Sequence, residues 1–199
     1  ITTQLSKHGD IRMDDYFWLR ERENPKVVDY LKKENAYTES MMKPAKELEE
    51  KIFQELKGRV KEDESFVPAK DGEYYYSARY EVGQQYPLHT RHKGSPQGPE
   101  EILINVPELA KGHSFFSSTG PRMSPNQQMM AFAVDTVGRR FYTIYFKDLK
   151  TGKTLPEKIE NVTGNLAWAN DNETIFYSEQ HPETLRTEKI YRYNLKTHK

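Results

Sequence analysis

The sequence has 199 residues, and its 30 Lys and Arg balance its 30 Asp and Glu, so the formal net charge at pH 7 is zero. Without net charge there is no overall field to hold a phosphate backbone or an anionic membrane, which argues against a general binder of nucleic acid or membranes. The absence of cysteine excludes disulfides, thiolate metal sites and a cysteine nucleophile within these residues. Thirteen Tyr and nine Phe in a polar composition favour a strand-rich protein.

Two helices are predicted between Asn24 and about Val60, with an interruption at Pro44. Asn24 followed by Pro25 is a typical helix start, because Asn can cap free amides and proline is preset for the first helical position. The apolar residues of the first helix can share one face (Val27, Val28, Tyr30 and Leu31). Those of the second helix are also helically spaced (Leu48, Ile52, Phe53 and Leu56). Gly58 is placed to end this second helix.

After Val67 the helical period disappears, and short strands are predicted instead. These segments are aromatic or β-branched and are separated by Gly, Asn, Asp or Pro. Seven are expected, at residues 74–80, 87–92, 102–106, 129–134, 141–146, 174–178 and 190–195. The run from Met129 to Val134 does not alternate, which predicts a strand covered on both faces. Gly152 suits a hairpin turn after the fifth strand.

The strands repeat with a period of about 45 residues. The order turn, strand, turn, strand that begins at Ser124 recurs at Ala169, with an offset of 45 residues at the first element and 46 at the second. A weaker copy begins at Lys70. This period is typical of a β-propeller blade, although chance similarity of two hairpins is the alternative.

We therefore predict a mainly β fold with two domains, a helical amino-terminal extension over residues 1–66 and the first blades of a β-propeller over 67–199. The 133 positions of the second part hold about three blades, whereas closed propellers need at least about four. An open array would expose the edge of its last blade, which natural proteins avoid. The chain is expected to be the front part of a longer protein.

No apolar run approaches the roughly 18 residues of a membrane span, and the opening residues ITTQLSKHGD lack the apolar core of a signal peptide. We therefore expect a soluble protein of the cytoplasm. The missing cysteine is compatible with that reducing compartment but does not prove it.

No catalytic, cofactor-binding or metal-binding residue is predicted. The segment Thr151–Thr154 looks like the tail of a phosphate-binding loop but lacks the earlier glycine that this loop needs. Ser40–Lys43 matches a serine-x-x-lysine pattern without its companion motifs, and Ser95 lies between glycines at the wrong spacing for a nucleophile elbow. His89 and His92 could share a metal only if their segment were helical, and its surroundings favour a strand.

Motifs along nearly the whole chain match one known family in their order and spacing. Those in the first part are HGDIRMDDYFWLR at residues 8–20, VDYL at 28–31 and ENAY at 34–37. Those in the second part are GRRF at 138–141, FKDLKTG at 146–152, LAWAND at 166–171, IFY at 175–177 and HPETL at 181–185. Together they resemble the prolyl oligopeptidase family of serine peptidases, and within it the oligopeptidase B (protease II) branch.

This resemblance implies an extension that packs on an α/β-hydrolase domain absent here, with a seven-bladed propeller that covers the active site and admits only short peptides. It also implies cleavage after Arg or Lys by a Ser-Asp-His triad. Because the triad and the specificity pocket cannot be placed in this chain, we expect the chain alone to be inactive. The implied partners are short basic peptides and the hydrolase domain of the same protein, without nucleic acid, membrane, metal or organic cofactor.

Two other functions are left open by the sequence. One is a stand-alone propeller-like module that binds a protein through its blades. The other is a prolyl oligopeptidase with post-proline specificity, which Arg139, Arg140 and the segment 181–185 disfavour. The aromatic cluster DDYFWLR at residues 14–20 is interpreted as an anchor for the amino terminus, and Trp18 is predicted to contact the hydrolase domain of the longer protein.

Overall fold

The computed structural model describes residues 2–199, which form two compact units, one reaching to Lys61 and the other spanning Glu62–Lys199. The segment just after this division already belongs with the strands, because the Phe66 amide donates to the Ala78 carbonyl at 2.8 Å. The domain limits 1–66 and 67–199 stay a prediction. Across the described residues, no helix is both long and apolar enough to cross a membrane.

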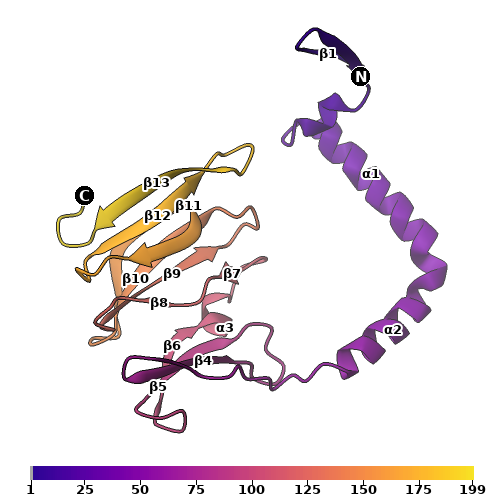
Figure 1. The fold of residues 1–199 in the computed structure, drawn as a ribbon. Coiled ribbons are helices and arrows are strands. Elements are labelled where there is room, and N and C mark those ends of the chain that lie inside the picture. Colours follow the sequence, from indigo (N-terminus) through magenta and orange to yellow (C-terminus); the bar gives the residue numbers. More distant parts are fainter. Residues whose placement is uncertain (1) are drawn as a thin grey trace. The chain divides into compact units, whose positions relative to one another are not determined.

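The first unit holds a β-hairpin followed by two long helices (Figure 1). Its elements are β1 (Thr3–Lys7), β2 (Asp10–Asp14), η1 (Phe17–Arg20), α1 (Pro25–Met42), η2 (Lys43–Ala45) and α2 (Lys46–Gly58). The predicted cap is confirmed, because the Asn24 side chain accepts a hydrogen bond from the Lys26 amide at 3.0 Å. The hairpin was not predicted from the sequence. His8 and Gly9 form its turn with φ angles of 55° and 85°, the left-handed geometry of tight hairpins.

The second unit begins with a four-stranded antiparallel meander, the first blade. Its strands are β3 (Ala69–Asp71), β4 (Tyr74–Arg79), β5 (Leu88–Lys93) and β6 (Glu100–Asn105), and the short helix α3 (Val106–Leu109) follows. The turn between β3 and β4 places Gly72 at a φ of 57° against the Gln127 side chain, where a Cβ atom would lie 2.6 Å from Nε2. Glycine at this turn therefore allows the first blade to approach the next one closely.

The remaining strands form one seven-stranded sheet that contains the second blade and the start of the third. They are β7 (Ser117–Ser118), β8 (Arg122–Met123), β9 (Met129–Asp135), β10 (Tyr142–Asp148), β11 (Thr154–Trp168), β12 (Thr174–Gln180) and β13 (Thr187–Asn194). β11 pairs with β10 up to Val162 and with β12 from there to Trp168, with a register shift between Val162 and Leu166. One long strand thus closes the second blade and opens the third.

The core consists of two apolar layers, one between each pair of successive blades. The first layer contains Leu103, Ile104, Val106, Phe116, Met130, Phe132 and Val134, and the second contains Ala131, Ala133, Ile144, Phe146, Val162 and Ile175. β9 contributes alternate residues to both layers. The prediction that this strand is covered on both faces is therefore confirmed, and so is the partial propeller.

The repeat is visible in equivalent contacts of the second and third blades. Phe132 stacks on Tyr145 with ring centroids 5.7 Å apart, and the residues 45 and 46 positions later, Tyr177 and Tyr191, stack at 5.6 Å. The indole of Trp168 donates to the carbonyl of the residue 46 positions earlier at 2.9 Å, which joins the two blades. All seven predicted strands are present, with ends within three residues of those expected.

Candidate functional site

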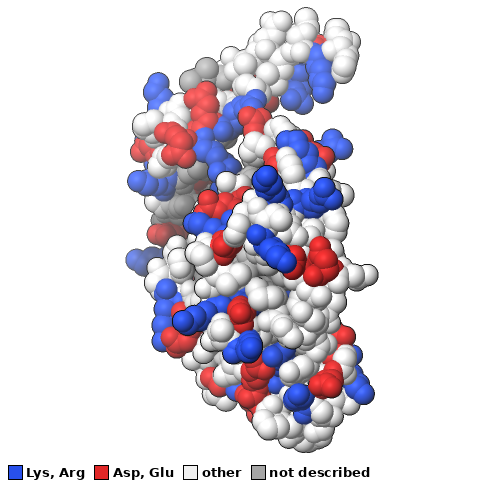
Figure 2. All heavy atoms as spheres, turned by 90° about the vertical axis from the view of Figure 1, so that its left-hand side faces the viewer, with Lys and Arg blue, Asp and Glu red and all other residues white. Residues whose placement is uncertain are grey.

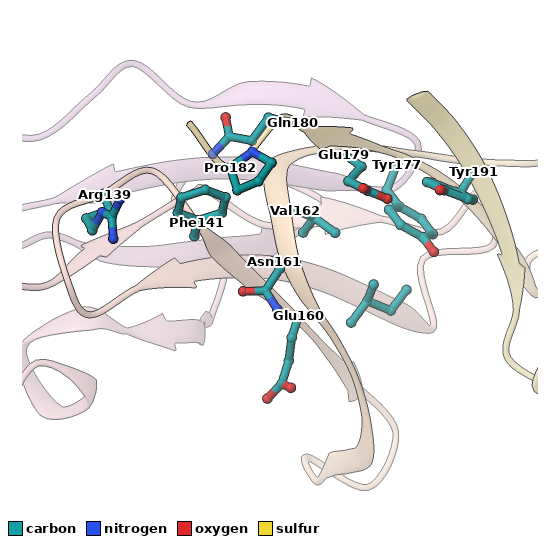
Figure 3. A pocket seen from close by; sticks show the side chains of 11 residues that line it. Arg139, Phe141, Glu160, Asn161, Val162, Tyr177, Glu179, Gln180, Pro182 and Tyr191 are labelled. Carbon is teal, nitrogen blue, oxygen red and sulfur yellow. The ribbon is translucent and has the colours of Figure 1, made fainter. Parts of the chain in front are cut away.

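A pocket of about 580 Å³ opens between the second and third blades (Figure 3). It exists because the two blade interfaces are connected differently. At the first interface the chain leaves β6 through α3, and Val106 and Phe116 from this connection are buried in the core. At the second interface β11 passes directly from blade to blade and adds no such segment. The space next to Val162 is left open as a result.

The pocket combines aromatic walls with charges of both signs. Its lining residues are Arg139, Phe141, Ile159, Glu160, Asn161, Val162, Tyr177, Glu179, Gln180, Pro182 and Tyr191. Two hydrogen bonds hold the pKa of the Glu179 carboxyl below its ordinary value. The larger effect comes from the Tyr191 hydroxyl, and the smaller from the Lys189 ammonium, which donates at 3.3 Å. The same Glu179 raises the pKa of Tyr191, and burial raises that of Tyr177. The carboxylate therefore stays ionised beside two protonated tyrosines at neutral pH.

Arg139 is presented to this pocket by a loop that a buried carboxylate fixes. Asp135, which is 2% exposed, accepts hydrogen bonds from the amides of Val137, Gly138 and Arg140 at 2.8–2.9 Å. From the neighbouring blade, the Gln180 amide donates to the Arg140 carbonyl at 2.7 Å. These bonds satisfy the backbone of the loop and so fix the path of the chain that carries Arg139 and Arg140.

A second pocket of about 450 Å³ lies between the first and second blades. Its lining includes His89, whose pKa burial lowers, so its imidazole is neutral at neutral pH. Close by, the buried guanidinium of Arg91 donates to Glu101 at 2.6 Å and to the Gln127 carbonyl at 3.1 Å, and it covers the Tyr74 ring at 4.1 Å. Arg91 thus joins the first blade to the second.

Between residues 2 and 199, no serine or threonine hydroxyl is hydrogen-bonded to a histidine ring, and no three His, Asp or Glu side chains could hold a metal. The structure also separates the two histidines of β5, since His92 Nδ1 lies 2.8 Å from the Gly98 carbonyl while His89 lines the second pocket.

The other sequence motifs occupy ordinary structural positions. Ser40–Lys43 lies at the end of α1. Thr151–Thr154 lies in the turn that joins β10 to β11, where Gly152 has a φ of 71°, so the predicted turn is confirmed. Within the cluster at residues 14–20, Trp18 packs edge-on against Tyr30, with ring centroids 5.7 Å apart. Figure 2 shows Lys and Arg interspersed with Asp and Glu over the face that it draws, without a patch of one sign.

Known proteins resemble the chain over almost its full length. The family model described as prolyl oligopeptidase, N-terminal beta-propeller domain, matches residues 2–199. A dipeptidyl aminopeptidase BI of Pseudoxanthomonas mexicana is 38% identical over 92% of the chain, and a protease 2 of Moraxella lacunata is 35% identical over 86%. The chain spans only 28% and 26% of the lengths of these two relatives.

Solved structures agree with the sequence relatives. Oligopeptidase B from Leishmania major superimposes with a TM-score of 0.87 at 27% identity, covering 98% of the chain and 29% of the solved protein. Oligopeptidase B from Trypanosoma brucei, in a closed form with covalently bound antipain, gives a TM-score of 0.86 at 25% identity, covering 98% and 30%. The likeness includes both the extension and the blades.

Proposed function

The chain belongs to the prolyl oligopeptidase family, whose N-terminal β-propeller domain it matches, and from this premise we propose that it is the non-catalytic front of a serine oligopeptidase that cleaves short peptides after Arg or Lys. Its partners would be the α/β-hydrolase domain of the same protein and short basic peptides. The resemblance to protease 2 and oligopeptidase B supports this specificity. The lack of cysteine is compatible with action in the cytoplasm.

One observation carries the proposal that further blades follow. Ala131 and Ile144 of the second blade are fully buried because the third blade covers them. The equivalent residues of the third blade, Phe176 and Ile190, are 43% and 79% exposed. A face that is apolar and buried in one repeat needs a cover in the next, because stacked repeats bury a continuous core.

In this proposal the blades gate the active site and the extension docks on the hydrolase domain. The extension is suited to docking because the apolar stripe of α2 is exposed (Leu48, Ile52, Phe53 and Leu56). Trp18 is half-buried within the extension, and the part of its ring that is still exposed would contact the hydrolase domain. Because the blades would cover the active site, only short peptides could enter it.

A second specificity is favoured by one relative. The Pseudoxanthomonas mexicana protein is named a dipeptidyl aminopeptidase, a name that denotes release of dipeptides from a free amino terminus. The post-proline alternative has less support, because neither the Pseudoxanthomonas mexicana nor the Moraxella lacunata relative carries that name. A stand-alone interaction module would require that no hydrolase domain accompanies this chain in the natural protein.

The proposal is tested by assaying the full-length protein and the 199-residue chain on four reporter peptides. Three peptides carry a blocked amino terminus and end in Arg, Lys or Pro before the reporter. The fourth has a free amino terminus and only two residues before the reporter, the second of which is Arg. We expect the full-length protein to cleave the blocked Arg and Lys peptides and the 199-residue chain to cleave none. Cleavage of only the free-terminus peptide would favour a dipeptidyl aminopeptidase. Hydrolysis by the chain alone would refute the absence of a catalytic group.

A further inference from the structure

Five turns of the second unit are capped in the same way. In each, one side-chain atom accepts hydrogen bonds from the amides two and three residues later. The five acceptor residues are Asp135, Asp148, Asp171, His181 and Asn194. Four of the acceptors are carboxylate or amide oxygens, the usual chemistry of such turns. The acceptor of His181 is a ring nitrogen.

The turn between β12 and β13 therefore depends on a lone pair of one imidazole. His181 Nδ1 lies 3.1 Å from the Glu183 amide and 3.3 Å from the Thr184 amide, and both of these groups can only donate. Nδ1 is therefore the acceptor in this turn, and the tautomer that fits it carries its ring proton on Nε2. The backbone supports the same turn, since the His181 amide donates to the Arg186 carbonyl at 2.9 Å.

Protonation removes this acceptor. A second proton on Nδ1 would point at the two amide hydrogens, so both hydrogen bonds would be lost and replaced by repulsion. Histidine is the side chain whose ordinary charge change falls between about pH 5 and 8. We propose that the β12–β13 turn is a pH-sensitive wall of the interblade pocket, closed while His181 is neutral and released when His181 is protonated.

The turn borders the pocket directly. Pro182 lines it, and Figure 3 shows Pro182 beside Phe141 and Gln180 at one wall. Gln180 immediately precedes His181 and holds the opposite loop through the Arg140 carbonyl. Releasing the turn would thus loosen both the wall and the loop that presents the arginines.

Charged residues of both signs belong to the turn and to the loop across from it. Glu179 lies in β12, and Glu183 and Arg186 lie in the turn itself, where the Arg186 carbonyl accepts from the His181 amide. Arg139 and Arg140 lie on the loop that Gln180 holds through the Arg140 carbonyl.

Hydrogen–deuterium exchange of the full-length protein tests the proposal without reference to peptidase activity. Exchange is followed by mass spectrometry at about pH 8 and about pH 5, with labelling times scaled to the intrinsic exchange rate at each pH. We expect the amides of Glu183 and Thr184 to lose protection about tenfold or more at the lower pH. The matching amides after Asn194, at Lys196 and Thr197, should keep theirs, because that acceptor does not titrate.

Two variants separate the imidazole from the rest of the turn. His181→Asp supplies the oxygen acceptor found in the other turns and should keep the protection at both pH values. His181→Ala removes the acceptor and should lack the protection at both. Equal protection of the wild-type turn at the two pH values would overturn the proposal. A pH-dependent loss in His181→Asp as large as in the wild type would overturn it as well.

Discussion

Removing the buried carboxylate of Asp135 should destabilise the second unit more than any exposed turn substitution. Three amides donate to this carboxylate at 2.8–2.9 Å, and Asp135 is only 2% exposed. In Asp135→Ala these amides would lose their acceptor. Hydrogen bonds to charged groups contribute about 1.5–3 kcal/mol each. Using the lower value for three bonds, we expect a loss of roughly 4.5 kcal/mol, which lowers the melting temperature by about 9–18 °C.

Thermal unfolding of the 199-residue chain, followed by circular dichroism, measures this loss. Asp135→Asn should fall between wild type and Asp135→Ala, because its oxygen can still accept two of the three bonds. Asp148→Ala is the matched control, since it removes an acceptor of two amides at a turn open to water and should shift the melting temperature much less. Equal melting temperatures for Asp135→Ala and Asp148→Ala would refute the reasoning.

Three further predictions concern stability. In the full-length protein, Trp18→Ala should lower the free energy of unfolding by more than about 2 kcal/mol. Tyr16→Ala is the control and should not, because Tyr16 is 70% exposed. An unchanged denaturation midpoint for Trp18→Ala would reject the role of Trp18 as an anchor. Trp168→Phe should cost about 1 kcal/mol in thermal melts, because it removes the interblade hydrogen bond and keeps the ring; melting at the wild-type temperature would contradict this. The hydrogen bond from Arg79 lowers the pKa of Glu100, so this pair stabilises the fold above the unfolded-state pKa and is lost as pH falls through the folded-state pKa. Glu100→Gln should therefore flatten the decline of the melting temperature on acidification, and an unchanged decline would exclude this pair as its cause.

Much of the fold could be predicted because the strongest strands are apolar and the helices have clear boundaries. Asn24 and Pro25 mark the start of α1, and the unalternating run of β9 marks the strand at the centre of both cores. β11 was missed for a physical reason. Its outward positions carry Lys158 and Glu160, and Pro156 interrupts its apolar pattern, yet pairing with strands on both sides stabilises it.

The pocket could not be predicted from the sequence, because it results from a difference between two connections rather than from a motif. Arg139 was noted as part of a family motif, but the buried Asp135 that positions its loop lies in a strand where apolar residues are usual. The aromatic stack of Tyr177 and Tyr191 depends on the strand register. The repeat offsets of 45 and 46 residues contained that information, since they relate this stack to the one in the previous blade.

The most direct test of the central claim is covalent labelling with a fluorophosphonate probe, which reacts with activated serine nucleophiles. The full-length protein and the 199-residue chain are labelled in parallel, and the modified peptide is identified by mass spectrometry. The account predicts that the full-length protein is labelled at a serine outside these 199 residues and that the chain alone is not labelled. A label within residues 1–199, or none on the full-length protein, would contradict it.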